Sequence, residues 1–157
     1  MTKEQLFIHL ATQLASEKLF YGHAVIDEED EAMMVMMYLY NQDVNEILSS
    51  GNEIIDSEVF KKASKIVNRR VQTLKPMAYI LGTVNFCGLN FKSDERALVP
   101  RSPIAELIHN GFAPWVNIDK VQSVLDLCTG SGCIGISIAH YYQYLKVDIS
   151  DISQQAI

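Results

Sequence analysis

The sequence predicts an α/β protein in which a small helical bundle precedes a β-hairpin linker and the first part of a nucleotide-binding α/β domain. The first 75 residues carry only helical patterns of apolar residues, which predicts an antiparallel bundle. Two short β-type runs flank Cys87-Gly88, as in a hairpin. An apolar run at 121–127, a glycine-rich turn and a helical pattern at 134–142 follow in the order that opens a βαβ unit. We therefore expect three segments, a helical bundle at 1–75, a linker at 76–100 and an incomplete α/β domain at 101–157.

The length and net charge of the chain limit the number of domains and the kinds of binding partner that can be expected. At 157 residues the chain has room for one domain, or for one small domain and part of another. Its formal net charge is −6 and no basic block occurs. This argues against a sequence-independent hold on nucleic-acid phosphates and against direct sequence-specific binding of nucleic acid. An acidic surface suits a basic protein partner.

Cysteine and histidine usage indicates a cytoplasmic protein with reduced thiols and no metal. The three cysteines are an odd number, and no pair has metal-ligand spacing. The histidines are scattered along the chain, so no zinc site is expected among His9, His23, His109 and His140. The sequence shows no signal peptide and no apolar run long enough to cross a bilayer, so no membrane partner is expected.

The first two helices of the bundle have recognisable starts. Thr2 and Gln5 have capping-box spacing, and the helix that follows is expected to run to about Leu19. The acidic run at 27–31 lies just ahead of a strongly apolar helix expected at 32–40. Acidic residues favour the N-terminus of a helix because they interact with its dipole.

Two more helices complete the predicted bundle. Asp43-Val44-Asn45-Glu46 is a second capping box, and Asp56 or Ser57 is expected to cap the helix that Pro76 stops. The apolar faces predict a shared core that contains Leu6, Leu10, Leu14, Met36, Leu39, Phe60 and Val67.

The last of these helices also carries a basic cluster opposite its apolar stripe. Its members are Lys61, Lys62, Lys65, Arg69 and Arg70. We interpret the cluster as a solvated face, with contact to RNA on a large assembly as the alternative.

The linker is expected to contain short extended segments. Residues 84–86 and 89–91 predict the two strands of a hairpin, and 96–99 predicts a further extended stretch that ends at a proline. Pro103 suits the first turn of a helix capped by Ser102.

The glycine-rich turn after 121–127 has the properties of a ligand-binding loop. Gly130 and Gly132 can adopt backbone angles closed to other residues, and neither has a side chain that would hold a ligand away. A second apolar strand, expected at about 145–149, runs into Asp151. That acid would lie at the carboxyl end of the neighbouring strand, where it can accept hydrogen bonds from ribose hydroxyls.

Two nucleotide classes fit this turn. Residues 130–135 match the G-x-G-x-x-G fingerprint of dinucleotide-binding folds, which is a weak signal alone. The segment with Asp126, Thr129 and 130–132 resembles motif I of class I S-adenosylmethionine methyltransferases, which have a Rossmann-like fold. An acid four residues before Gly130 suits the cationic methionine half of that cofactor and does not favour a pyrophosphate.

The resemblance implies S-adenosylmethionine as the cofactor. Cys128 departs from the motif, because many such enzymes have glycine there. The implied cofactor-binding residues are Asp126, Cys128, Thr129, Gly130, Ser131, Gly132 and Asp151. A fragment of a nicotinamide-dependent oxidoreductase stays as an alternative, and so does a turn that only lets a helix pack on a strand.

Three further stretches resemble the protein glutamine methyltransferases. They are Pro-Met-Ala-Tyr-Ile-Leu-Gly at 76–82, Phe-Cys-Gly-Leu-Asn-Phe at 86–91 and Leu-Val-Pro-Arg at 98–101. The family methylates the side-chain amide of a glutamine in a protein, and it joins a helical bundle to a methyltransferase domain through a β-hairpin. The resemblance implies that the bundle at 1–75 recognises the substrate. The resemblance is close from about Pro76 onward and is one of layout only over the bundle.

The resemblance also favours one branch of the family. Enzymes that act on release factors usually continue Pro-Arg with a proline and an acidic run, whereas Ser102 follows Arg101 here. This resembles the branch that acts on the third large-subunit ribosomal protein. A release factor is the alternative protein substrate, and Pro100 and Arg101 are expected on the substrate side.

One element of the family's pattern is absent from this sequence. The catalytic Asn-Pro-Pro-Tyr motif, which positions the substrate amide, does not occur in it. The sequence ends at Ile157, soon after the second expected strand, and two strands do not close a core. We therefore expect the N-terminal part of a longer enzyme, inactive by itself. A purely non-enzymatic docking module is the remaining alternative.

Overall fold

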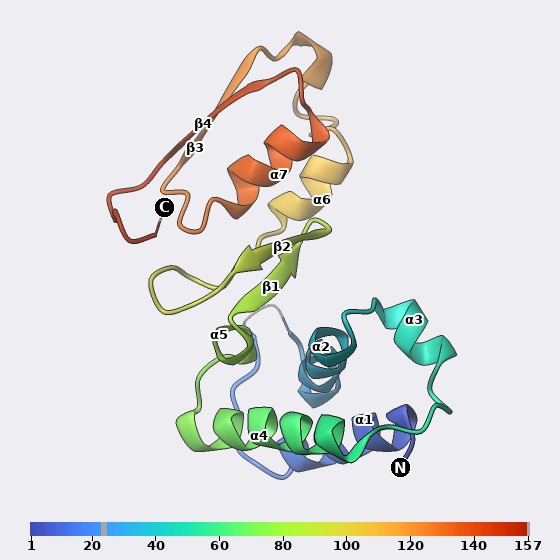
Figure 1. Ribbon diagram of the computed structural model, residues 1–157. Helices are drawn as coiled ribbons and strands as arrows, with labels where there is room; N and C mark the ends of the chain where they lie inside the picture. The colour runs from blue at the N-terminus through green and yellow to red at the C-terminus, as the bar shows by residue number, and fades with distance from the viewer. Residues whose placement is uncertain (23–24, 157) are drawn as a thin grey trace. The chain divides into compact units, whose positions relative to one another are not determined.

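The computed structural model describes residues 1–22 and 25–156. It divides the chain into two compact units, Met1–Leu81 and Gly82–Ile157 (Figure 1). Each unit has its own secondary structure and packing. We therefore describe the two units separately.

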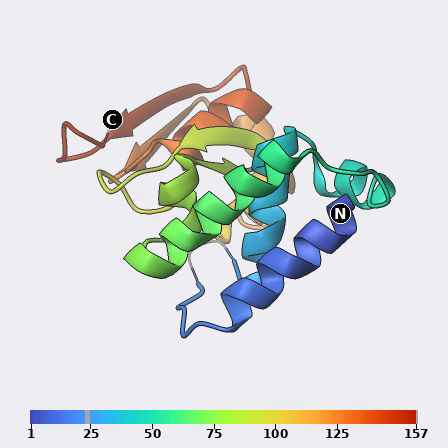
Figure 2. The ribbon, with the colours of Figure 1, turned by 60° about the horizontal axis from the view of Figure 1, so that its bottom comes forward.

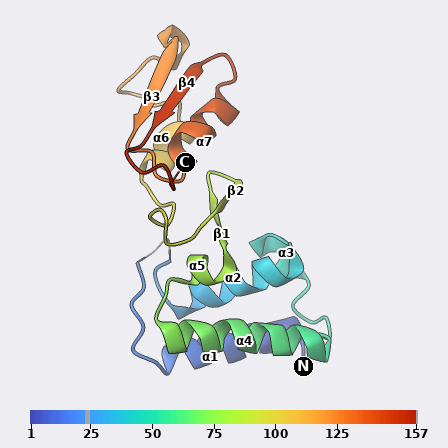
Figure 3. The same cartoon turned by 60° about the vertical axis from the view of Figure 1, so that its left-hand side comes forward.

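Unit 1 is all helical. Its helices are α1 (Lys3–Ala15), α2 (Glu28–Tyr40), α3 (Val44–Ser49), α4 (Ser57–Thr73) and α5 (Met77–Leu81). Helices α1 and α4 lie side by side in Figures 2 and 3, and α2 packs against both of them. The short helix α5 packs against α2 and α4, and its Met77 is part of the core. Residues assigned to the linker from sequence thus contribute to the bundle.

The predicted capping boxes form as expected. The Thr2 hydroxyl accepts a hydrogen bond from the Gln5 backbone N–H (3.2 Å), and the Gln5 side chain accepts one from the Thr2 N–H (3.0 Å). Asp43 and Glu46 make the same reciprocal pair, with distances of 2.9 Å and 2.8 Å. Each box satisfies two backbone N–H groups at a helix end that have no partner within the helix.

Two predicted helix boundaries are wrong. Helix α1 ends at Ala15 rather than near Leu19. Helix α2 begins at Glu28 because the Asp27 side chain accepts hydrogen bonds from the N–H groups of Glu29 and Asp30, both at 3.0 Å. The acidic run is therefore the cap and first turn of α2, where its charges favour the positive end of the helix dipole.

The core of unit 1 matches the sequence prediction at most positions. Five of the seven predicted residues are fully buried, namely Leu6, Leu10, Leu14, Met36 and Val67. The other two, Leu39 and Phe60, are only half-buried and pack against the edge of the core.

Arg70 is not on the exposed basic face where the sequence prediction placed it. It is 1% exposed, because position 70 lies on the same side of α4 as the buried residues Ala63 and Val67. Its guanidinium pairs with the buried carboxylate of Glu31, with Nε at 2.9 Å from Oε2, and donates to the carbonyl of Phe20 at 2.9 Å. Desolvation raises the pKa of Glu31, and the hydrogen bonds from Arg70 counteract that rise.

Unit 2 begins with the predicted hairpin. Strands β1 (Thr83–Phe86) and β2 (Leu89–Lys92) pair antiparallel, with Phe86 opposite Leu89. The two turn residues, Cys87 and Gly88, both have positive φ angles (49° and 76°), as the tight hairpin turns that match strand twist require.

The segment after the hairpin differs from the prediction. Residues 96–99 form no strand, because the Asp94 carboxylate accepts hydrogen bonds from the backbone and side chain of Arg96 and folds the chain into a turn. The Ser102 hydroxyl accepts from the Ile104 N–H at 3.2 Å as a cap would. However, helix α6 (Ile104–His109) begins one residue after Pro103.

The rest of unit 2 is a βαβ arrangement. After the short 3-10 helix η1 (Ile118–Lys120) come β3 (Ser123–Leu127), α7 (Cys133–Tyr141) and β4 (Lys146–Ser150). The two strands pair in parallel, and α7 packs against both (Figure 3). Tyr141 of α7 donates a hydrogen bond to the Cys87 carbonyl at 3.1 Å, which ties the helix to the hairpin turn.

Truncation of a core leucine tests the packing of unit 1. Leu10→Ala removes a fully buried side chain, so we expect unfolding to become easier by about 2–5 kcal/mol. For a domain of this size each kcal/mol lowers Tm by roughly 4–8 °C. Ile8→Ala on the same helix is the control, because Ile8 is 55% exposed. A Leu10→Ala protein that melts with the Ile8→Ala protein in circular dichroism would show that the helix phase is wrong.

A double-mutant cycle tests the buried ion pair. Glu31→Leu leaves Arg70 charged and buried, and we expect a loss of about 3–5 kcal/mol in the free energy of unfolding. The double variant Glu31→Leu/Arg70→Met removes both charges, so its loss is expected to be smaller than the sum of the two single losses. Urea unfolding measures each value. Glu58→Gln at the exposed Lys61 pair is the control and is expected to change stability by about 1 kcal/mol or less.

Candidate functional site

The candidate site lies in unit 2, where the two parallel strands end. Strand β3 ends at Leu127 and runs into the glycine-rich turn, and β4 ends at Ser150, next to Asp151. The strands pair in register, with Leu127 opposite Ser150, so their carboxyl ends meet at one edge. The Thr129 N–H donates to the Ser150 carbonyl at 3.0 Å and extends this pairing into the turn. In α/β sheets, ligands bind at this edge.

Each glycine of the G-x-G-x-x-G pattern has a separate structural role. Gly130 has a φ of 56°, and a side chain there would meet nothing nearer than the Cβ of Ala97, at 3.9 Å. Gly132 has a φ of 77°, and a Cβ would lie 2.9 Å from the Ile136 side chain. At Gly135 a Cβ would lie 2.5 Å from Ile149 of β4. The pattern therefore opens one side of the turn at Gly130 and brings α7 close to the sheet at Gly135.

Asp126 is turned inward, toward the base of the turn. Its Oδ2 atom accepts hydrogen bonds from the Thr129 hydroxyl and from the Gly135 N–H at 2.8 Å. One carboxylate oxygen thus joins β3, the turn and α7. The direct interaction of Asp126 with a cationic cofactor stays a prediction, because both of these contacts are made within the protein.

Asp151 follows the end of β4, as the sequence pattern predicts, and in addition contacts the glycine turn. Its two oxygens accept from the N–H groups of Ser153 (2.9 Å) and Gly130 (2.8 Å). These backbone hydrogen bonds hold the pKa of Asp151 below its usual range. Asp151 is therefore ionised at neutral pH and is a pure acceptor beside the open face of Gly130.

The remaining predicted cofactor residues have different exposures. Thr129 and Gly132 are buried, Ser131 is half-buried, and Cys128 is exposed with a positive φ of 59°. Side chains in this backbone region are strained, which fits the expectation of glycine at this position in related motifs.

The cysteines in this unit are free thiols. At the start of α7, burial raises the pKa of Cys133, which favours the protonated thiol at neutral pH.

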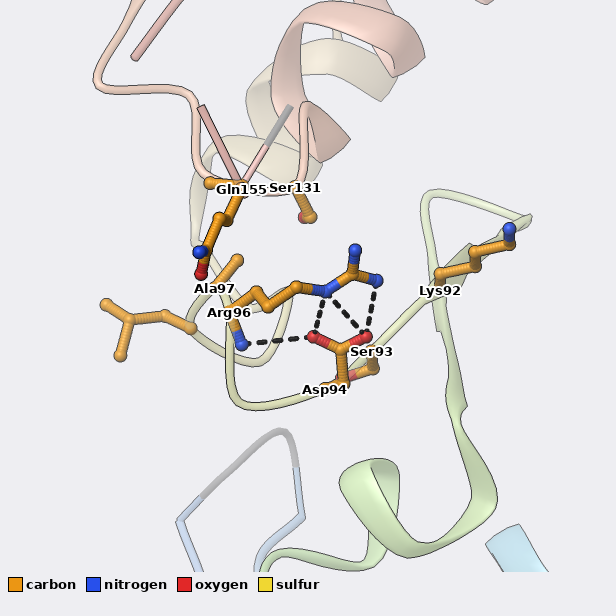
Figure 4. Close-up of a pocket in the computed structure, with 9 residues that line it drawn as sticks. Lys92, Ser93, Asp94, Arg96, Ala97, Ser131 and Gln155 are labelled. Carbon is orange, nitrogen blue, oxygen red and sulfur yellow. Dashed lines mark hydrogen bonds and ion pairs between the residues drawn. The ribbon is translucent and has the colours of Figure 1, made fainter. Parts of the chain in front are cut away.

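A cavity of about 300 Å³ adjoins the turn at Ser131. Its lining comes from the end of β2 and the segment that follows it, from the turn and from the segment after β4. The lining residues are Lys92, Ser93, Asp94, Arg96, Ala97, Leu98, Ser131, Gln155 and Ala156. Figure 4 shows the Arg96 guanidinium between Asp94 and the segment that carries Ser131. The guanidinium donates to Asp94 through Nε (2.8 Å) and Nη2 (2.6 Å) and lowers the pKa of Asp94 to about 2.

The sequence reasoning missed two parts of this site. Gly135 holds Asp126 through its N–H, and the fingerprint itself marked that position. The sequence contains no motif that predicts the ion pair between Asp94 and Arg96, which are simply two charged residues in a loop. Neither Pro100, which is buried, nor Arg101, which is exposed, is among the residues that line the cavity in the described part of the chain.

The described residues contain no group of three or more His, Cys, Asp or Glu side chains that could hold a metal ion. His23 lies outside the described residues. Across residues 1–22 and 25–156, none of the helices is both long and apolar enough to span a membrane.

Comparison with known proteins gives a consistent set of relatives, although no family model matches the chain. A ribosomal protein uL3 glutamine methyltransferase from Xylella fastidiosa is 42% identical over 147 residues, which are 94% of this chain and 47% of the relative. The enzyme of the same name from Francisella tularensis is 38% identical over 151 residues, or 93% of this chain and 47% of the relative. That from Xanthomonas campestris is 42% identical over 139 residues, or 88% and 45%.

The chain spans about half the length of the curated relatives it matches. The aligned residues, about 40% of them identical, cover nearly all of the chain. The chain is therefore homologous, over about half of their length, to the ribosomal protein uL3 glutamine methyltransferases.

Proposed function

We propose that this chain carries the cofactor-binding turn of an S-adenosylmethionine-dependent methyltransferase that modifies a glutamine side-chain amide in ribosomal protein uL3. The observation that carries the proposal is the hydrogen bond between the Gly130 N–H and Asp151, where β3 and β4 end. Asp126 fixes the turn by accepting a hydrogen bond from the Gly135 N–H. The homology to uL3 glutamine methyltransferases supports both the reaction class and the substrate. Those relatives favour a ribosomal protein over a release factor as the substrate.

The residues at the turn suit S-adenosylmethionine. The open side of Gly130 lets a ligand approach the backbone closely, and the Asp151 carboxylate has lone pairs left for the ribose hydroxyls after accepting two backbone N–H groups. The carboxylate is ionised, so these hydrogen bonds are charge-assisted. When bound, the cofactor supplies an activated methyl group.

Asp126 acts on the ligand site through the turn. The hydrogen bonds that it accepts from Thr129 and Gly135 fix the position of the turn relative to the start of α7. The position of the turn determines where a ligand can contact the turn backbone. We propose that Asp126 is a positioning residue for the turn, and that its negative charge also favours the cationic half of the cofactor.

Methyl transfer itself depends on positioning the substrate amide for in-line attack. The family motif with this role, Asn-Pro-Pro-Tyr, does not occur in these 157 residues. We therefore assign cofactor recognition to this chain and transfer to the whole protein that contains it. A Rossmann-like arrangement of that whole domain is part of the same proposal, and the parallel β3–α7–β4 unit supports it.

Removal of the Asp151 carboxylate tests cofactor recognition. In the complete enzyme we expect Asp151→Ala to weaken S-adenosylmethionine binding ten-fold or more, because each charge-assisted hydrogen bond is worth roughly 1.5–3 kcal/mol. Calorimetric titration measures the affinity. Asp148→Ala is the matched control, because Asp148 is an exposed acid on β4 that pairs with Lys146. Equal affinities of the Asp151→Ala and Asp148→Ala proteins would remove Asp151 from the site.

The division between cofactor recognition and transfer is also testable. We expect the 157-residue chain to transfer no labelled methyl group from S-adenosylmethionine to purified uL3, whereas the complete protein does so at a glutamine. Mass spectrometry of uL3 identifies the modified residue. Turnover by the 157-residue chain alone would contradict the assignment, and so would a complete protein that methylates no glutamine.

A further inference from the structure

A groove on the outer surface of α4 is not used by the proposed methyl-transfer site, and we propose that it binds the sugar-phosphate backbone of RNA. Its volume is about 550 Å³. It lies between two adjacent rows of side chains, each spaced four residues apart along the helix. One row contains Phe60, Ser64, Asn68 and Gln72, and the other contains Lys61, Lys65 and Arg69.

The groove concentrates positive charge on an acidic protein. Five of the thirteen lysine and arginine residues of the chain lie in α4, and no acidic side chain lines the groove among the described residues. Arg70 points inward and is neutralised by Glu31, and Lys61 pairs with Glu58 at 2.6 Å. Within the described part of the chain, Lys65 and Arg69 have no ion-pair partner. An incoming anion meets Lys65 and Arg69 without breaking an ion pair, and meets Lys61 in exchange for Glu58, whereas Lys62 does not line the groove.

The spacing of the cations suits a repeating anion. In an α-helix, residues four apart are separated by about 6 Å along the axis. Lys61, Lys65 and Arg69 thus form a line of charges at regular intervals on one side of α4. Successive phosphates of an extended RNA strand present a comparable repeat, and flexible lysine and arginine side chains adapt to small differences in register.

The second row supplies hydrogen-bond donors along the same line. The Asn68 carbonyl oxygen accepts from Gln13 of α1 at 2.7 Å, and this leaves the amide N–H₂ of Asn68 as a donor. The Ser64 hydroxyl oxygen is buried and is not exposed to the groove. Amide donors such as that of Asn68 commonly contact phosphate and sugar oxygens.

RNA fits this surface better than an acidic peptide does. The carboxylates of an acidic peptide follow no fixed repeat, whereas the phosphates of an RNA strand repeat at an interval close to that of the cation row. The aromatic residue of the groove, Phe60, is half-buried, with its ring centroid 5.4 Å from that of His9. The net charge of −6 argues against a hold on nucleic-acid phosphates over the surface as a whole, and the groove is a local exception because no acidic side chain lines it among the described residues. The methyl-transfer proposal is not required for this inference, although an enzyme with a ribosomal substrate would meet RNA.

Binding of a fluorescein-labelled single-stranded oligouridylate to the 157-residue chain tests the proposal by fluorescence anisotropy. We expect binding at low salt that weakens as salt rises, with a slope of about −2 in a plot of log K against log salt, as for three phosphate contacts to a single strand. Lys65→Gln/Arg69→Gln is expected to weaken binding at least ten-fold and to reduce the slope by about 1.4. Circular dichroism melting is expected to be unchanged, because both side chains are exposed.

The matched control is Lys120→Gln/Lys146→Gln, which removes the same charge from exposed positions of unit 2. Control affinity equal to the parent, together with weakening by the α4 pair, would support the groove. Equal weakening by both pairs would mean nonspecific attraction and would overturn it. Absence of RNA binding at low salt would overturn it as well. Groove-dependent binding of labelled poly-glutamate in place of RNA would assign the surface to an acidic protein segment instead.

Discussion

The Asp126 carboxylate is the interaction on which the candidate site depends. A single oxygen accepts from the hydroxyl of Thr129 and from the backbone of Gly135, so the end of β3, the glycine turn and the start of α7 are held at one point. This arrangement leaves the outer face of Gly130 open and lets Asp151 reach its N–H from the neighbouring strand. Removal of that carboxylate would free the turn at its base, where a ligand site needs its backbone fixed.

Close packing between α7 and the sheet completes that arrangement. Gly135 lies so near Ile149 that any side chain would overlap it, and the N–H of the same glycine is the donor to Asp126. The hydrogen bond and the absence of a side chain therefore act together. A helix set farther from the sheet would lose the contact to Asp126, and the turn would no longer be held between the two strands.

The helical unit contains a buried ion pair. Glu31 and Arg70 are both almost completely buried and form an ion pair, and the Phe20 carbonyl accepts a further hydrogen bond from Arg70. Since this pair removes Arg70 from the surface, four basic residues stay exposed on α4, and three of them, Lys61, Lys65 and Arg69, line the groove. Helix α4 thus carries one cation, Arg70, that stabilises the core, and other cations on its outer surface that can contact a partner.

Local patterns in the sequence determined what depends on neighbouring residues: the capping box at Thr2, the hairpin turn at Cys87-Gly88 and the strand–turn–helix order around Gly130. These features follow from backbone angles and short-range hydrogen bonds, which a one-dimensional pattern records. Only the tertiary structure decided that Arg70 is buried and that Asp126 faces its own turn. The partners of a charged side chain often come from distant segments of the chain, which only the folded structure brings together. The protonation of that side chain depends on its burial and on those partners as well as on the residue type.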